Sequence, residues 1–494
     1  MFSCSHTALW TYGCVYSLNR ERANVTKLFC FIVGITALAL AGCGGSLSGS
    51  SPSGGNTNVT LLASSTANGR FAGYGIAFTS ITLTNKAGKT VSLLSQPQGV
   101  EFIHLNGISE PLLTVSVPED VYTSAAIQFY SAYFEVAYLS PTTGGPAIGH
   151  YIYLNVTPYP PVVNLPDSGL AINGAKMVLS LNLLVSQSAT LASDTAGAAY
   201  TITPTFTLSP VNVAALPTNI SNGKVDDITG SIQSVSQEGF SLLLDDSDGS
   251  SVPPITYNID SGTVFQGIGG LSSLAPGMSV NLEAQFQPDG SLLATRVYVP
   301  NPTAADTMRG TLVNVNAVYP IGGFGVLSQI QDGAELSSQG PDRMGYGYES
   351  QTAFQISPAY TNPQNLPFPA VFNGASSTAI GQNVSVSSAG IGNYGGGNTT
   401  AVTVTLMPQM INGTVSSISN SGSYTAYTVI LASNDSIVEL GGATNVVIYA
   451  ESSTQMLNTS PIAVGGVARF YSLVFNDSGT LRMDCAQIND GVAE

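Results

Sequence analysis

Most of this sequence is without cysteine. Four of the five cysteines lie within the first 43 residues, and only Cys485 lies beyond them. This distribution excludes a disulfide framework, and a zinc site built from thiolates, in the rest of the chain. We expect Cys485 to be a small buried residue.

Charge is also scarce, positive charge above all. Charged residues make up 9% of the 494 residues, and 29 acidic residues outnumber 13 basic ones. No cluster of lysine or arginine follows the first thirty residues, so the chain would repel phosphate backbones. We therefore expect no nucleic-acid partner.

Residue types that carry common catalytic chemistry are few. Of the three histidines, His104 lies in an apolar run and is predicted to be structural, and His150 is predicted to start a strand. No Gly-x-Ser-x-Gly elbow, His-Glu-x-x-His pair or Walker loop occurs. We expect no catalytic residue and no cofactor. A pair of carboxylates distant in sequence, as in glycosidases, stays open as an alternative.

Two short patterns resemble sites. Residues 390–395 form a Gly-x-Gly-x-x-Gly pattern, but strand-like residues 402–406 follow where a dinucleotide site needs a helix. This pattern therefore predicts a hairpin loop. The acidic loop with Asp245, Asp246 and Asp248 has oxygen ligands for calcium, but the downstream bidentate glutamate of a calcium loop is missing. A solvated turn is favoured, and we expect no metal site.

No segment carries a helical apolar stripe over three turns. From residue 59 onward, short apolar and β-branched runs alternate with turns rich in Gly, Pro, Asn and Asp. We therefore predict an all-β chain, with sandwiches or barrels. A length of 494 residues is too great for one ordinary core, so several domains are expected.

An export signal precedes this body. Basic residues flank the apolar run 28–40, which is shorter than the about 20 residues that a spanning helix needs. The run ends in Leu40-Ala41-Gly42-Cys43, which resembles the bacterial lipobox. The resemblance implies a signal peptide over residues 1–42 and a lipid on Cys43. An uncleaved anchor and a plain signal peptide are the alternatives.

The lipobox resemblance also implies a location. A lipid-anchored protein of this type lies in the cell envelope, and Gly44 after the lipidated cysteine implies the outer membrane if the organism is Gram-negative. The chain would then contact the membrane through the lipid on Cys43. Residues 43–58, rich in Gly and Ser, are predicted to form a flexible tether.

Residues 59–210 are predicted to form a β-sandwich-like domain. Alternating apolar residues indicate strands, with a change of phase at Thr79-Ser80 and a turn at residues 85–88. Landmarks between Phe71 and Leu208 resemble an uncharacterised β-rich domain common in bacterial lipoproteins. These landmarks are residues 76–83, 102–107, 117–122, 181–185 and 200–204. That family has no established activity.

After a linker at 211–227, one pattern recurs three times. The units are predicted at residues 228–300, 301–408 and 409–494, the second with a loop insertion around residues 339–372. Each unit opens with an apolar residue, a glycine and a further apolar residue, at Ile228–Ile232, Met308–Leu312 and Ile411–Val415. A threonine recurs within each unit, at Thr263, Thr352 and Thr454.

The repeat resembles a second family of unknown function that is widespread in bacterial exported proteins. This resemblance implies three small Greek-key barrels of the OB type in tandem. The recurring glycine suits a barrel strand that bends sharply.

Three tyrosines of the first domain, Tyr133, Tyr151 and Tyr153, are candidate ligand-binding residues, because aromatic rings on a sheet face stack on sugars. Ordinary strand tyrosines are the alternative. The composition favours a non-catalytic binding or scaffolding module of the envelope, for polysaccharide or a partner protein. A glycan-acting enzyme with Asp/Glu pairs and a structural spacer are the alternatives. The sequence does not determine the oligomeric state.

Overall fold

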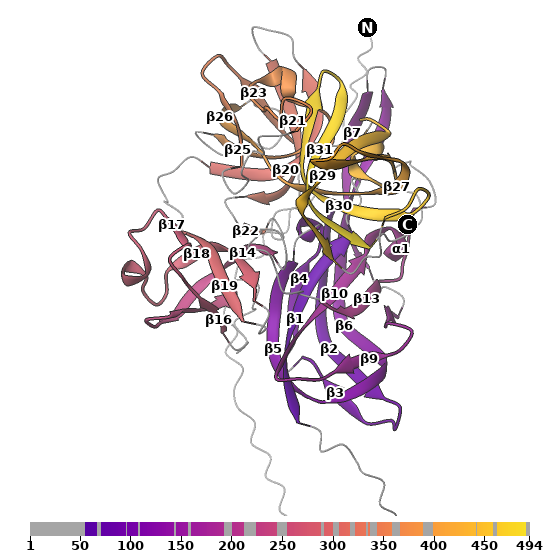
Figure 1. Ribbon diagram of the computed structural model, residues 1–494, viewed down its shortest axis with the longest axis vertical. Coiled ribbons are helices and arrows are strands. Elements are labelled where there is room, and N and C mark those ends of the chain that lie inside the picture. Colours follow the sequence, from indigo (N-terminus) through magenta and orange to yellow (C-terminus); the bar gives the residue numbers. More distant parts are fainter. Residues whose placement is uncertain are drawn as a thin grey trace, which may run out of the picture. The chain divides into compact units, whose positions relative to one another are not determined.

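A computed structural model gives the fold of the chain (Figure 1). It describes residues 55–66, 71–94, 96–106, 109–142, 145–156, 160–191, 200–211, 224–244, 254–287, 291–299, 306–316, 322–331, 334–335, 343–357, 366–388, 399–440, 442–457 and 462–490. Strands dominate these residues, and the only α-helices among them are single turns, α1 (Val185–Ser188) and α2 (Ser436–Glu439). The predicted all-β fold is confirmed. No helix in these ranges is long and apolar enough to cross a membrane.

The N-terminal strands form two main sheets. The first has the order β5 (Ser109–Pro118), β1 (Asn56–Thr66), β10 (Lys176–Leu184), β13 (Thr205–Pro210) and β8 (Val162–Asn164). The second has the order β3 (Thr90–Ser92), β2 (Phe71–Asn85), β6 (Asp120–Thr142) and β7 (Gly145–Val156), with β4 (Gln98–Glu101) beside β2 and β9 (Leu170–Ile172) beside β6. A two-stranded sheet joins β11 (Ala189–Leu191) and β12 (Tyr200–Ile202).

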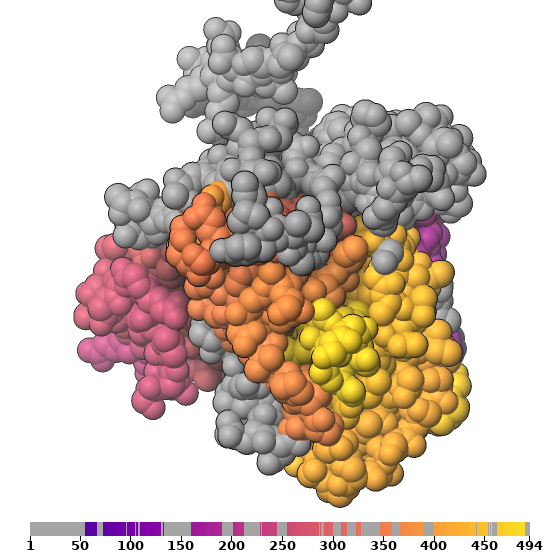
Figure 2. Space-filling model, turned by 90° about the horizontal axis from the view of Figure 1, so that it is seen from above, coloured from indigo at the N-terminus to yellow at the C-terminus, as the bar shows by residue number. Residues whose placement is uncertain are grey.

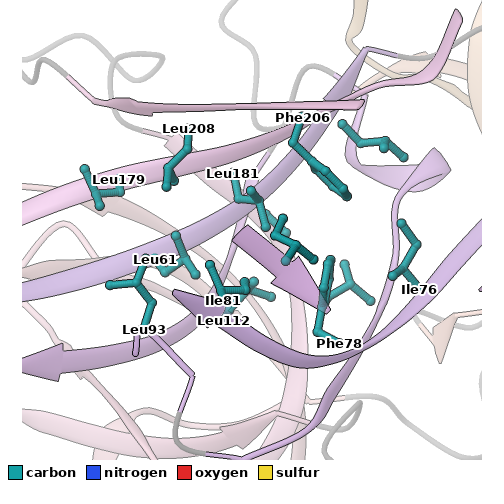
Figure 3. Close-up of a cluster of buried hydrophobic side chains, with 14 of the residues drawn as sticks. Leu61, Ile76, Phe78, Ile81, Leu93, Leu112, Leu179, Leu181, Phe206 and Leu208 are labelled. Atoms are coloured by element: carbon teal, nitrogen blue, oxygen red, sulfur yellow. The ribbon is translucent and has the colours of Figure 1, made fainter. Parts of the chain in front are cut away.

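The two main sheets enclose one apolar core. Leu61, Leu181 and Phe206 of the first sheet and Ile76 and Phe78 of the second all belong to the same buried cluster, where they point toward one another (Figure 3). Phe102 lies within 6.0 Å of the Phe78 ring and 5.8 Å of the Phe206 ring, measured between centroids. Burial of these rings is the main favourable term that holds the sheets together.

A bulge in β2 accounts for the irregular pattern of its apolar residues. Ile76, Phe78, Ile81 and Leu83 are all buried, although strict alternation would put the last two on the other face. The register to β6 shifts on both sides of Phe78, which restores the inward direction of the later residues. The predicted change of phase at Thr79-Ser80 is confirmed.

The three repeats form three barrels with one topology. In each barrel, the first strand pairs antiparallel with the second and the fourth. The second strand pairs antiparallel with the third, and the fourth pairs antiparallel with the fifth. The third and fifth strands then pair in parallel and close the barrel. This is the strand order of the OB fold. The predicted OB-like repeats are confirmed.

The strands of the barrels are as follows. The first barrel contains β14 (Lys224–Val235), β15 (Gly239–Leu244), β16 (Ile255–Asn258), β18 (Ser279–Phe286) and β19 (Leu292–Tyr298), with β17 (Val264–Gln266) beside β19. The second contains β20 (Asp306–Asn316), β21 (Gly322–Gln331), β23 (Arg343–Tyr348), β25 (Asn383–Ser388) and β26 (Thr399–Leu406), with β24 (Ala353–Ile356) beside β26 and β22 (Ala334–Glu335) beside β21. The third contains β27 (Gln409–Asn420), β28 (Tyr424–Leu431), β29 (Asn445–Leu457), β30 (Val467–Asp477) and β31 (Thr480–Asp490).

The recurring glycine lies where two barrel strands come closest. A Cβ atom on Gly230, Gly310 or Gly413 would lie 2.3, 2.0 or 2.3 Å from a carbonyl oxygen of the second strand. No real Cβ atom tolerates such a contact, so these positions require glycine.

Two strands begin inside segments predicted to be irregular. Strand β1 begins at Asn56, within the predicted tether, because the Thr57 side chain is buried and pairs with Val117. Strand β14 begins at Lys224, within the predicted linker, because Lys224 and Val225 pair with β18. Pairing partners distant in sequence extend both strands beyond what composition indicates.

Candidate binding faces

The strand register brings the three candidate tyrosines to one face. Tyr133 of β6 pairs with Asn155, Glu135 with Tyr153, and Ala137 with Tyr151. Paired residues share a sheet face, as do residues two apart along a strand. Tyr133, Tyr151 and Tyr153 therefore share one face of the β6–β7 pair, called here the tyrosine face. Their side chains lie outside the described part of the structure.

The tyrosine face is turned away from the sandwich core. Phe134, the neighbour of Tyr133, pairs with Tyr74, which is fully buried in the core cluster. Because neighbouring strand residues lie on opposite faces, the position of Tyr133 is on the face opposite the core. Its partner on β2 is Gly75, which is itself buried, and strands β20 and β21 of the second barrel contact β7 and β2.

A second face, on the third barrel, combines aromatic rings with charged groups. The Tyr424 and Tyr449 rings lie 5.3 Å apart in an edge-to-face arrangement. The guanidinium of Arg482 lies 5.9 Å from the centre of the Tyr449 ring and also donates a hydrogen bond to the Tyr449 hydroxyl. We call Tyr424, Tyr449, Phe475, Arg482 and Asp484 the outer cluster, because their strand neighbours fill the barrel interior.

An ion pair fixes the cation of the outer cluster. Nε of Arg482 lies 2.7 Å from Oδ2 of Asp477, and both side chains are about one-quarter exposed. The aromatic contact and the ion pair together hold the guanidinium in one position. Asp477 is therefore the carboxylate partner of Arg482.

Asp484 carries the perturbed carboxyl group of the outer cluster. Burial, which removes water, and the nearby charge of Glu451 together raise its pKa from 3.8 to about 7. Burial is the larger of the two causes. Asp484 pairs with Tyr449 on β29, and Glu451 follows two residues later on the same face. Close to neutral pH, the carboxyl group of Asp484 can therefore hold or release a proton.

A segment of the second barrel covers the outer cluster. Residues 366–372, called here the strap, place Phe368 with its ring centre 5.3 Å from that of Tyr449 and 5.7 Å from that of Phe475. At the other end of the strap, the ring centre of Phe372 lies 5.8 Å from the ring centre of Phe354, which belongs to the same barrel as the strap. Side chains of the second repeat, orange, lie against those of the third, yellow (Figure 2).

Hydrogen bonds reinforce this contact. Nε2 of the fully buried Gln382 donates to the carbonyl oxygen of Val474 at 2.9 Å. Nδ2 of Asn476 donates to the carbonyl oxygen of Thr378 at 3.0 Å. Residues 374–382, called here the joint loop, and the strap thus attach the second barrel to β30 of the third.

Sequence reasoning did not find the outer cluster. Arg482 and Asp484 alternate with the buried Met483 and Cys485, which indicates a strand with one polar face. That pattern alone does not show that an aromatic residue from the preceding repeat covers the face. The strap lies in the segment that the sequence predicts only as a loop insertion.

The remaining sequence candidates have different outcomes. Cys485 is 4% exposed and unpaired with another cysteine, so its predicted burial is confirmed. Cys43, the calcium candidates Asp245, Asp246 and Asp248, and residues 390–395 all lie outside the described residues. Within the described ranges, no group of three or more His, Cys, Asp or Glu side chains could hold a metal ion.

Comparisons with known proteins found a family model that matches one of the repeats. Residues 229–298, which contain most of the first barrel, match a family described as a domain of unknown function (DUF5666). No curated protein matches the chain. Six chains of solved structures match, among them one titled drosophila Unr CSD456, which is 10% identical, spans 54% of this chain and 98% of its own length, and has a TM-score of 0.12.

Proposed function

We propose that this protein is an exported bacterial lipoprotein that serves as a non-catalytic binding or scaffolding module of the cell envelope. The lipid on Cys43 would anchor it to a membrane, in the outer membrane if the organism is Gram-negative. Its ligand is an envelope polysaccharide, with a partner protein as the second class. The tyrosine face is the observation that carries the binding part of this proposal.

Aromatic residues at one sheet face suit a sugar ligand. Tyrosine offers an apolar ring for stacking and a hydroxyl for hydrogen bonding, which matches the alternating apolar and polar surfaces of a pyranose. The excess of acidic over basic residues, 29 against 13, favours a neutral or cationic glycan over a polyanion.

One experiment tests anchoring. Cells that make the full chain or its Cys43→Ala variant are fractionated, and each form is partitioned between detergent and water. We expect the wild type in the detergent phase and the variant in water. Equal partitioning of the two forms would contradict the lipid anchor.

A second experiment tests the tyrosine face. The exported protein is incubated with the solubilised envelope fraction, and the polysaccharide and the protein that it retains are measured separately for wild type and the triple variant Tyr133→Ala, Tyr151→Ala and Tyr153→Ala. Tyr298→Ala, a half-buried strand tyrosine of the first barrel, is the control. We expect retention to be lost only in the triple variant. Retention of protein but not glycan would favour a partner protein, and no retention at all would favour a spacer.

The outer cluster supports one alternative, a glycan-acting enzyme. Such an enzyme needs two carboxyl groups, one of which stays protonated near neutral pH. Asp484, whose pKa burial raises to about 7, and Glu451 on the same strand face would be the pair in this alternative. Release of reducing sugar from envelope glycan, lost in Asp484→Asn, would support this alternative over the binding module.

A further inference from the structure

We propose that the contact between the second and third barrels is a pH-sensitive joint, which tightens when Asp484 takes up a proton from solvent and loosens when it releases that proton. The joint consists of the strap, the joint loop and the outer cluster. This proposal does not depend on the lipid anchor or on any ligand.

Asp484 lies beneath the joint. On β31 it is paired with Tyr449 of β29 and with Leu473 of β30. Both partners belong to the apolar cluster that includes Phe368 of the strap. Closure of the strap over Tyr449 therefore removes water from the neighbourhood of the Asp484 carboxyl group.

The strap and the joint loop bring no charge to the outer cluster. Residues 366–382, which form the strap and the joint loop, contain no titratable side chain. The strap therefore brings no cation to the outer cluster; its Phe368 ring lies 5.7 Å from the guanidinium of Arg482, beside Asp484 on β31. A carboxylate that loses water without gaining a cation is destabilised relative to the neutral acid.

The third barrel places one further carboxylate and one guanidinium, which is already in an ion pair, close to Asp484. Glu451 of β29 lies on the same face as Asp484 and repels its charged form. Arg482 of β31 is paired with Asp477 of β30. Tyr424 of β28 and Tyr449 of β29 are the remaining titratable groups of this face, and the Cys485 thiol points to the opposite, interior side. No available positive charge faces Asp484 among the described groups.

The direction of the pH effect follows from these contacts. With the joint closed, the pKa of Asp484 is about 7; when the joint opens, water returns and the pKa moves toward 3.8. The closed form therefore binds the proton more tightly than the open form. Closure is favoured most below about pH 4 and becomes less favourable as the pH rises toward 7, by at most about tenfold per pH unit for one proton.

A second carboxyl group close to the joint has to be separated from this effect. Asp435 caps α2, and the α2 residue Ile437 packs beneath Gly381 of the joint loop. Burial raises the pKa of Asp435 to about 6. A test of the joint must therefore show that the pH dependence belongs to Asp484.

Amide hydrogen exchange of the full chain provides that test. Protection of residues 366–382, corrected for the intrinsic pH dependence of exchange, is measured between pH 5 and 8 in wild type, Asp484→Asn and Asp435→Asn. Peptides from the first barrel serve as the internal reference, and Asp120→Asn, an exposed carboxylate of the sandwich, is the control variant.

We expect protection in the wild type, in Asp120→Asn and in Asp435→Asn to fall by several-fold to tenfold from pH 6 to 7, and to be flat over that interval in Asp484→Asn. Glu451→Gln should shift the fall to lower pH, and this variant decides the matter if Asp484→Asn does not fold. Protection independent of pH in the wild type, or an unchanged slope in Asp484→Asn, would overturn the proposal.

Discussion

The hydroxyl of Thr454 donates a 2.7 Å hydrogen bond to the carbonyl oxygen of Cys485, and so ties the loop within β29 to the last strand of the third barrel. Thr263 makes the same bond to Ala294 in the first barrel, and Thr352 to Ala401 in the second, each at 2.7 Å. Each threonine oxygen also accepts a hydrogen bond from the backbone N–H three residues earlier. The recurring threonine is therefore a structural element of the repeat.

Replacing one of these threonines should destabilise its barrel. Thr352→Val keeps the shape of the buried side chain but leaves the Ala401 carbonyl and the Glu349 N–H without their partner. We expect the free energy of unfolding to fall by about 1–3 kcal/mol. Denaturant titration measures this change. Thr352→Ser, which keeps the hydroxyl, should lose clearly less; equal losses would contradict the assignment.

The recurring glycine should tolerate no side chain. In Gly310→Ala the new Cβ atom would lie 2.0 Å from the Leu327 carbonyl oxygen, so β20 and β21 must separate. We expect a loss of about 3 kcal/mol in stability, measured by thermal unfolding. Gly99→Ala is the matched control, because Gly99 lies in strand β4 with open space around its Cβ position. A change similar in both variants would refute the close-approach argument.

The strap should contribute to the stability of the third barrel through one ring. Phe368→Ala removes a side chain that is 7% exposed and leaves Tyr449 and Phe475 without their contact. We expect a loss of about 3 kcal/mol. Val371→Ala, in the same strap but 45% exposed, should change stability by less than about 0.5 kcal/mol. The two variants are compared by denaturant titration at constant pH.

The buried carboxyl group of Asp435 should make stability depend on pH. Its folded pKa, about 6, lies above the ordinary 3.8, so the folded chain binds the proton more tightly than the unfolded chain. This contribution is complete below about pH 4 and is lost as the pH rises through 6, by roughly 3 kcal/mol in total.

Asp435→Asn removes this pH dependence. The amide cannot accept hydrogen bonds from both Ile437 and Asn412, so the variant should also lose some stability at every pH. The difference between wild type and variant should shrink between pH 4 and 6. Asp120→Asn is the control with the opposite sign, because the hydrogen bond from Asn85 lowers the pKa of Asp120. A constant difference for Asp435→Asn would contradict the prediction.

The fold could be predicted because local signals agree with one another. The phase change in β2 and the Asn85 turn, where Oδ1 accepts from the N–H groups of Ala87 and Lys89, are both visible in the sequence. The repeat is visible because each barrel needs glycine and threonine at the same positions. The early start of β1 is not visible, because it depends on a partner strand that is distant in sequence.

The outer cluster could not be predicted for a similar reason. The environment of Asp484 depends on Phe368, which belongs to another repeat, and on a pairing between β29 and β31 that brings Glu451 close. Periodicity identifies the face of a strand but not what covers it. The perturbed carboxyl group therefore appears only when the barrels are assembled.

The strand order also sets when each part of the chain can fold. In the third barrel the closing pair Val447 and Arg482 is separated by a short stretch of chain, so this barrel can close soon after its own residues are made. In the sandwich, one edge of β1 pairs with β5, and the other edge pairs in parallel with the more distant β10, for example Asn58 with Lys176. The N-terminal sheet must wait for a loop that costs more entropy to close. Strand β1 therefore keeps one unpaired edge until β10 has been made, and during that interval this edge can pair with another chain.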